Sequence, residues 1–161
     1  MKKLLPILCL FLLFGCKKQA DVRPSEIFKI LPNHSIALSS RNSQSSFLAY
    51  RFEKTGNKYV GYYEKDIIGD LACDDCGNPF IAFEFDPTLS TFSYTTTSDF
   101  ENAQAINGMT SSFFGAWASR IVSSKIEGKK MDNNTWYIIL KVKQQNQSEE
   151  TTLDGYFRRF D

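Results

Sequence analysis

The chain has 161 residues, with 19 basic and 18 acidic side chains, a formal net charge of +1 and 14% aromatic residues. This length fits one domain of ordinary size. The balanced charge argues against a protein that binds nucleic acid or a highly charged partner through a large surplus of one sign. The many Phe and Tyr residues are typical of strands that face a core.

Residues 1–16 have the features of a targeting segment rather than of a folded element. Lys2 and Lys3 precede an apolar run, 4–14, in which Pro6 is the one interruption. The run is much shorter than the roughly 20 residues that span a bilayer. It contains no polar residue at helical spacing, which argues against a helix packed on a core. The segment is either an ordinary secretory signal peptide or a signal that ends in a membrane anchor.

The segment ends on Leu13-Phe14-Gly15-Cys16, which resembles the lipobox of bacterial lipoproteins. In that family an aliphatic, a variable and a small residue precede the cysteine. The resemblance covers residues 1–16 alone. It implies cleavage before Cys16, a diacylglycerol on its sulfur and a fatty chain on its new amine. Each buried methylene contributes about 0.8 kcal/mol, so three chains would hold the protein to membrane lipid durably.

We therefore expect a cleaved signal peptide (1–15), a lipidated cysteine with a polar tether (16–25) and one β-rich domain (26–161). Loss of Lys2 and Lys3 makes the charge balance slightly negative. Lys17 is not the aspartate that resembles an inner-membrane retention signal in enteric bacteria, and no acidic run follows Cys16. We expect a lipid-anchored protein on the periplasmic face of the outer membrane.

The first half of the domain predicts one short helix and several strands. Helical spacing of Ile27, Ile30 and Leu31 predicts a turn or two of helix before Pro32. A polar loop is expected at 39–46. Residues 46–54 and 58–65 flank a turn signal at 55–57 and predict a hairpin. Residues 66–72, 79–86 and 91–97 are further predicted strands, with Ile81, Phe83 and Phe85 on one face.

The second half predicts a helical insert followed by a meander. Ser98 and Glu101 suggest a capping box for a helix ending near Gly108, and a second helix is expected at 110–119. Residues 120–130, 135–144 and 152–160 predict strands, with turns at 132–134 and 146–150. The fold class is therefore α+β and mostly antiparallel β: about seven or eight strands as an open barrel or sandwich, with a helical insert near 98–119.

Cys73 and Cys76 form the second cysteine motif, and three interpretations of it remain open. Residues i and i+3 of a turn lie within reach of a disulfide, and disulfides persist outside the cytoplasm, so we expect a bridge that pins a loop. A redox-active dithiol needs positive neighbours, whereas Asp74 and Asp75 separate these sulfurs. Half of a metal site is the third interpretation, but zinc needs further Cys or His ligands.

Catalytic patterns are weak, and we expect no enzyme and no cofactor. His34 is the single histidine, and it follows a proline in a predicted loop. No nucleophile elbow or phosphate-binding glycine motif occurs. Glu84 and Asp86 share a strand face, but a catalytic acid pair also needs a cleft.

Aromatic side chains are the remaining candidates for binding. A stacking platform for sugars or bases could be formed from Tyr59, Tyr62, Tyr63, Trp136, Tyr137, Tyr156 and Phe157, although a β-rich core uses similar numbers. The leading hypothesis is a ligand-binding or scaffolding lipoprotein, with a small apolar or sugar-like ligand in a cavity lined by aromatics such as Phe83 and Trp136. The alternative is a protein-interaction or inhibitor lipoprotein of the envelope, with an exposed apolar patch instead. An enzyme, including a thiol oxidoreductase, is the third hypothesis.

Overall fold

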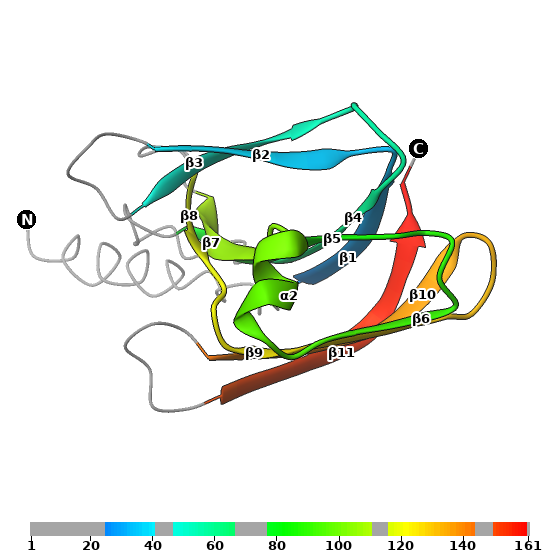
Figure 1. Ribbon diagram of the computed structural model, residues 1–161. Helices are drawn as coiled ribbons and strands as arrows, with labels where there is room; N and C mark the ends of the chain where they lie inside the picture. Colours follow the sequence, from blue (N-terminus) through cyan, green and yellow to red (C-terminus); the bar gives the residue numbers. More distant parts are fainter. Residues whose placement is uncertain (1–24, 41–46, 67–76, 111–115, 144–149, 161) are drawn as a thin grey trace, which may run out of the picture.

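The computed structural model describes residues 25–40, 47–66, 77–110, 116–143 and 150–160. Eleven strands in these ranges form one sheet, which curls into a half-barrel with almost no helix (Figure 1). The β-rich, mostly antiparallel prediction is confirmed, whereas the strand number was too low and the α+β assignment gave too much helix. In chain order the elements are β1 Ser25–Pro32, β2 Ser35–Ser40, β3 Leu48–Glu53, β4 Tyr59–Asp66, β5 Asn78–Phe85, β6 Thr91–Tyr94, α2 Thr97–Asn102, β7 Ile106–Thr110, β8 Trp117–Arg120, β9 Ser124–Lys130, β10 Thr135–Lys143 and β11 Glu150–Arg159.

The strands lie in the order β2-β3-β8-β7-β5-β4-β1-β11-β10-β9-β6. All registered pairs are antiparallel except β1 with β11, which run parallel with Lys29 opposite Arg158. The predicted meander of the last three strands is confirmed, since β10 pairs with both β9 and β11. The parallel pair joins this meander to β1, so both ends of the described chain meet inside one sheet.

The barrel core fills the concave side of the sheet. Alternation along β10 places Trp136, Ile138, Leu140 and Val142 in this core, as predicted, because successive side chains of a strand point to opposite faces. Aromatic rings from other strands pack against them, and the Phe85 and Trp136 ring centroids are 5.0 Å apart. Helix α2 lies between β5 and β9 in Figure 1 and contributes Phe100 to the same core.

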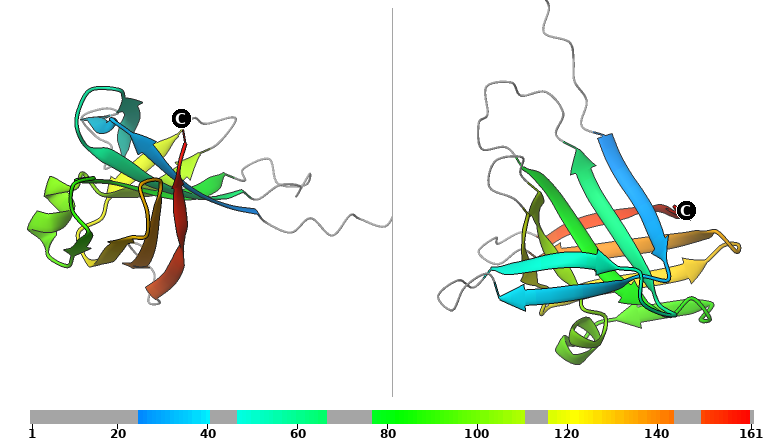
Figure 2. Two further views of the ribbon diagram at one scale, coloured as in Figure 1. Left: turned by 90° about the vertical axis from the view of Figure 1, so that its right-hand side faces the viewer. Right: turned by 90° about the horizontal axis from the view of Figure 1, so that it is seen from above.

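A second, hairpin core lies on the convex side. Its buried members are Ile36, Val60, Tyr62, Phe80, Ala82, Ile106 and Ala118. Strands β2 and β3 form a hairpin that folds back over β4 and β5, as the view from above shows (Figure 2). Strand β5 is therefore buried on both faces, which explains its almost uninterrupted apolar sequence.

The predicted pairing of 46–54 with 58–65 is wrong, although both strands exist as β3 and β4. β3 pairs with β2 and with β8, whereas β4 pairs with β1 and β5. The segment at 55–57 does turn the chain, but it connects β3, in the hairpin on the convex side, to β4 in the sheet beneath that hairpin. β2 was not predicted, and Asn33, with φ of 58°, forms the corner that leads into it.

The helix expected around Ile27 and Ile30 is also wrong. Residues Ser25–Pro32 are strand β1, in register with β4 from Ser25 opposite Asp66 to Pro32 opposite Tyr59. β1 is central in the sheet, so Phe28 and Ile30 meet the barrel core while Leu31 meets the hairpin core. Apolar residues on both faces of a strand gave the sequence its apparent helical spacing.

The helical insert is shorter than expected. α2 ends at Asn102, and its N-cap is Thr96, whose side chain forms a capping box with Asp99 instead of the predicted Ser98 and Glu101. Residues 106–110 and 117–120 are strands β7 and β8, so the second predicted helix is wrong in its described part. The polar loop predicted at 39–46 is wrong at Ser39 and Ser40, which end β2. The rest of that prediction, and those for 67–72 and 146–149, lie outside the described residues.

Candidate functional site

The free half of the convex surface is the strongest candidate site in the described part of the chain. The β2–β3 hairpin covers the outer sides of β4 and β5, but β6, β9, β10 and β11 turn their outer sides to solvent at the opposite side of the molecule (Figure 1). We call the solvent-facing side of these four strands the outer face. It presents Thr91, Ser93, Lys125, Glu127, Lys129, Tyr137, Ile139, Lys141, Thr152, Asp154, Tyr156 and Arg158.

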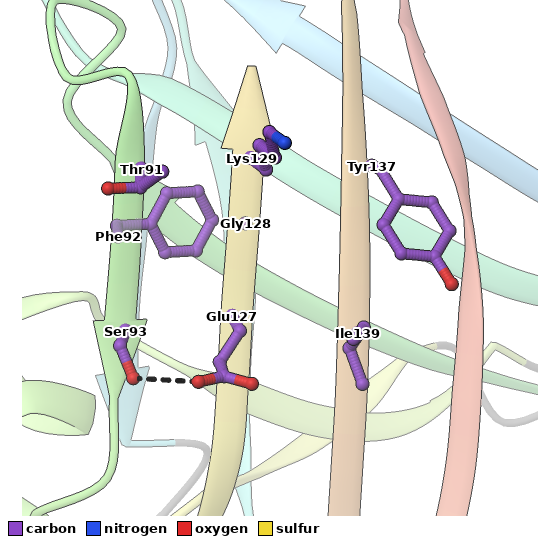
Figure 3. Close-up of a pocket in the computed structure, with 8 residues that line it drawn as sticks. All are labelled: Thr91, Phe92, Ser93, Glu127, Gly128, Lys129, Tyr137 and Ile139. Atoms are coloured by element: carbon purple, nitrogen blue, oxygen red, sulfur yellow. Dashed lines mark hydrogen bonds between the residues drawn. The ribbon is translucent and has the colours of Figure 1, made fainter. Parts of the chain in front are cut away.

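A surface hollow of about 530 Å³ lies on this face (Figure 3). It is lined by Thr91, Phe92, Ser93, Glu127, Gly128, Lys129, Tyr137 and Ile139. All but two of these side chains point away from the barrel core, because they alternate with buried residues along their strands. The exceptions are Gly128, which has no side chain, and Phe92, whose ring packs beneath it. The volume lies in the range of small-molecule sites.

The strand register brings the polar residues of the hollow together in rows. Lys129 of β9 lies opposite both Thr91 of β6 and Tyr137 of β10. In the next row Glu127 lies opposite Ser93 and Ile139. Ser93 Oγ donates to Glu127 Oε1 at 3.4 Å, and Lys125 Nζ lies 3.0 Å from the same oxygen. Ser93 and Lys125 thus hold the Glu127 carboxylate in place on a surface that is otherwise open to solvent.

Two tyrosines form the aromatic side of the site. Tyr137 and Tyr156 are directly opposite on β10 and β11, and their ring centroids are 5.3 Å apart at an angle of 52°. Tyr156 is 56% exposed. The Tyr137 hydroxyl donates to Asp154 Oδ2 at 2.6 Å, and this hydrogen bond raises the pKa of Tyr137. The pair forms an angled aromatic wall beside the hollow.

The outer face carries charges of both signs: four cations, Lys125, Lys129, Lys141 and Arg158, and two carboxylates, Glu127 and Asp154. Lys125 lies directly opposite Lys141, a like-charged cross-strand pair that is unfavourable by itself. Glu127 and Asp154 occupy the next row on either side of Ile139. An ion bound near Lys129, Glu127 or Lys125 would therefore meet like charge in an adjacent row.

A second polar cluster surrounds Glu64 at the end of β4. Its Oε2 accepts from the Tyr62 hydroxyl at 2.8 Å, and its Oε1 accepts from Asn78 Nδ2 and Thr110 Oγ1, both at 3.2 Å. The chain's own donors thus occupy both oxygens. This arrangement joins β4, β5 and β7 and leaves the carboxylate little capacity for a ligand.

The acid pair considered from the sequence does not form a catalytic site. Glu84 is 4% exposed and lies under the β2–β3 hairpin, where Oε1 accepts from the Ile36 N–H and Oε2 from Lys58 Nζ, both at 2.7 Å. Asp86 is exposed beyond the end of β5 and accepts from the Thr88 N–H and hydroxyl, which lower its pKa. The Glu84 carboxylate thus joins β5 to the β2–β3 hairpin, whereas the Asp86 carboxylate stabilises the turn after β5.

Seven aromatic residues were considered as a platform, and the structure separates them. Trp136, Phe157 and Tyr63 lie in the barrel core, with Tyr59 packed against it, and Tyr62 lies in the hairpin core. Only Tyr137 and Tyr156 of the seven belong to the outer face. Phe83 and Trp136, expected to line a cavity, are fully buried among other rings, and the hollow described here is on the other side of the sheet.

The cysteine predictions lie outside the described residues, which include neither Cys16 nor Cys73 and Cys76. His34 is partly buried in the β1–β2 corner, where Nδ1 donates to the Pro32 carbonyl at 2.7 Å. No group of three potential metal ligands occurs within the described ranges. Nor does a helix of those ranges reach the length and hydropathy needed to cross a membrane.

Sequence reasoning missed the polar members of the site, including Ser93, Glu127, Lys129 and Asp154. The available signal was the alternation in 135–144, which places Tyr137 and Ile139 opposite the buried face. That signal does not reveal which strands flank β10. Comparison of the chain with protein-family models, curated proteins and solved structures found no match.

Proposed function

We propose that this protein is a lipid-anchored envelope protein whose half-barrel domain binds a small ligand on the outer face. The observation that supports ligand binding is the hollow of about 530 Å³ beside the exposed Tyr137–Tyr156 pair. Aromatic walls combined with a few positioned polar groups are typical of small-molecule sites. The proposed binding site is therefore on the convex surface, whereas the sequence had suggested the barrel interior.

The anchor is proposed from the residues around Cys16. Acylation of Cys16 would tether the domain to membrane lipid, and we place it on the periplasmic face of the outer membrane. The Cys16→Ser variant should appear in the soluble fraction, and mass spectrometry should find no lipid on it. A variant that stays membrane-bound and acylated would overturn this proposal.

Ligand binding is tested by native mass spectrometry of the full-length protein taken from its own membranes. We expect a non-covalent mass on the wild type that is lost or much reduced in a Tyr137→Ala/Tyr156→Ala double variant. Phe47→Ala is the matched control, because Phe47 is an exposed aromatic residue outside the outer face. A wild type that carries no ligand, or a ligand retained by the double variant, would contradict the proposal.

The disulfide between Cys73 and Cys76 remains part of this proposal. In the oxidising envelope it would close a short loop next to β5. Denatured masses with and without reductant should differ by two hydrogens. Equal masses would favour the thiol or metal interpretation instead.

Protein binding is the second candidate function. Tyr156 and Phe160 are 56% and 63% exposed near the C-terminal end of β11, with Arg158 between them. Tyr and Arg are enriched among residues that dominate interface energies. A native complex with an envelope protein, lost on Phe160→Ala but retained by the Tyr137→Ala variant, would favour this function over a small ligand.

A further inference from the structure

We infer that the ligand of the outer face is an uncharged saccharide. This inference rests on the proposed function and adds the chemical class of the ligand. It combines three properties of the described surface: an exposed aromatic wall, positioned donors and acceptors, and charges of both signs at the hollow.

The aromatic wall suits a sugar ring. Tyr137 and Tyr156 lie side by side, and the Tyr156 ring is more than half exposed. Aromatic faces carry partial negative charge, which attracts the slightly positive C–H groups on the face of a pyranose. A flat, purely apolar ligand would use the rings equally well, so the polar groups must decide between the two classes.

The polar groups lie in the row of the rings and in the row next to it. Asp154 Oδ2 already accepts from the Tyr137 hydroxyl, which leaves its second oxygen as an acceptor at the edge of the wall. Lys129 lies in the row of Tyr137, while Glu127 and Ser93 lie in the next row. Neighbouring strands are about 4.8 Å apart. Donors and acceptors are thus spaced to meet several hydroxyl groups of one or two sugar rings.

The charges in and beside the hollow argue against ionic ligands there. A phosphate or carboxylate near Lys129 would also approach Glu127 in the adjacent row, and a cation near Glu127 would approach Lys125 and Lys129. Hydroxyl groups both donate and accept, so an uncharged polyol can satisfy side chains of either sign. The size of the hollow also favours an oligosaccharide over a single small ion.

The test is a glycan array that carries neutral and anionic oligosaccharides, followed by calorimetry with the best ligand. The full-length protein is used in a polyoxyethylene detergent, because maltoside detergents carry sugar head groups themselves. We expect binding to neutral oligosaccharides. Loss of one aromatic ring from the wall in Tyr156→Ala should weaken binding by about tenfold, as expected when a tyrosine at the centre of a binding site is truncated. Tyr156→Phe keeps the ring and should stay within about threefold of the wild type.

Two further variants separate the polar from the aromatic contribution. Asp154→Asn removes the charge but keeps an acceptor, so we expect a smaller loss than for Asp154→Ala. Phe47→Ala should bind like the wild type. Binding that prefers anionic glycans, or that Tyr156→Ala leaves unchanged, would overturn the inference.

A negative array is interpreted with the native mass measurement. If no glycan binds and the native ligand has a mass that no saccharide explains, the saccharide inference fails while the proposed function stands. If no glycan binds and the protein carries no ligand, both fail.

Discussion

Glu84 connects β5 to three other parts of the domain through its side chain and its backbone. Its carboxylate binds the Ile36 N–H of β2 and Lys58, while its backbone N–H donates to the Ala103 carbonyl and its carbonyl accepts from the Tyr94 hydroxyl. Glu84 thus links β5 to the β2–β3 hairpin, to the segment after α2 and to β6. A buried carboxylate is tolerated here because it has both a cation and a hydrogen-bond donor.

Glu84→Ala should lower the free energy of unfolding by about 2–4 kcal/mol, because it leaves the buried Ile36 N–H without its acceptor. Glu84→Gln keeps an acceptor oxygen and should lose less. Urea unfolding measures both values. Glu127→Ala is the control, since loss of a half-exposed ion pair at the surface should change stability by no more than about 1 kcal/mol. Equal effects of Glu84→Ala and Glu127→Ala would contradict the role given to Glu84.

Buried and half-buried tyrosines make the stability sensitive to alkaline pH. Burial, with a smaller effect of nearby carboxylates, raises the pKa of Tyr50, Tyr63 and Tyr94 each to about 12. In the unfolded chain these groups titrate near 10. The unfolded state therefore loses protons first, so the stability gained below about pH 10 is lost as the pH rises through about 12.

Urea unfolding at a series of pH values should show this decline above about pH 10. Tyr94→Phe removes one titrating group and should make the decline less steep, even if its stability at neutral pH is also lower. An unchanged slope in Tyr94→Phe would show that Tyr94 does not contribute.

At the scale of the strand pair, glycines make room for aromatic rings on neighbouring strands. Gly61 lies opposite Phe83, and Gly128 lies opposite Phe92. A Cβ on Gly61 or Gly128 would come within 2.5 Å of the ring of its partner. The rings of Phe83 and Phe92 thus lie across the neighbouring strand and fill the barrel core on the concave side of the curled sheet.

Gly128→Ala should therefore destabilise the domain by about 1–3 kcal/mol through overpacking. Gly56→Ala is a matched control, because no atom lies within 4 Å of the position that its Cβ would occupy. Thermal or urea unfolding compares the two. Combining Gly128→Ala with Phe92→Leu should recover part of the loss, and additive losses would argue that the ring is not the cause.

At the scale of the whole molecule, the two halves of the sheet differ in how firmly they are held. β10 pairs with β11 from Thr135 to Lys143 and with β9 along most of its length. In the described residues the register of β3 with β8 consists of Leu48 opposite Ala118. The hairpin is otherwise held by its core and by the bond from Ile36 to Glu84.

Hydrogen exchange should therefore be faster in β2 and β3 than in β9, β10 and β11. Local opening of the hairpin breaks fewer backbone pairs than opening of the meander. Mass spectrometry of exchanged peptides measures this difference, and Glu84→Gln should widen it. Uniform protection across the sheet would mean that the hairpin and the meander unfold as one unit.

Local patterns were sufficient for most strands and for which of their side chains are buried. The alternation of Trp136, Ile138, Leu140 and Val142 has a period of two residues, which a single segment carries in itself. The same reasoning failed for Ser25–Pro32, because a central strand with two buried faces has no such alternation. The signal peptide and the lipidation of Cys16 were also inferred from local sequence, and both stay predictions.

Strand partners were decided by the tertiary structure. The turn at 55–57 predicted a hairpin, but β4 pairs with β1 and β5, whereas β3 pairs with β2 and lies over them. The outer face was likewise invisible from the sequence, because Ser93, Glu127, Tyr137 and Asp154 lie on four strands. Local sequence patterns predicted β3–β6 and β9–β11 as strands, but they missed β2 and predicted helices that overlap β1, β7 and β8. Only long-range register, set by the packing of both cores at once, decided which polar residues meet.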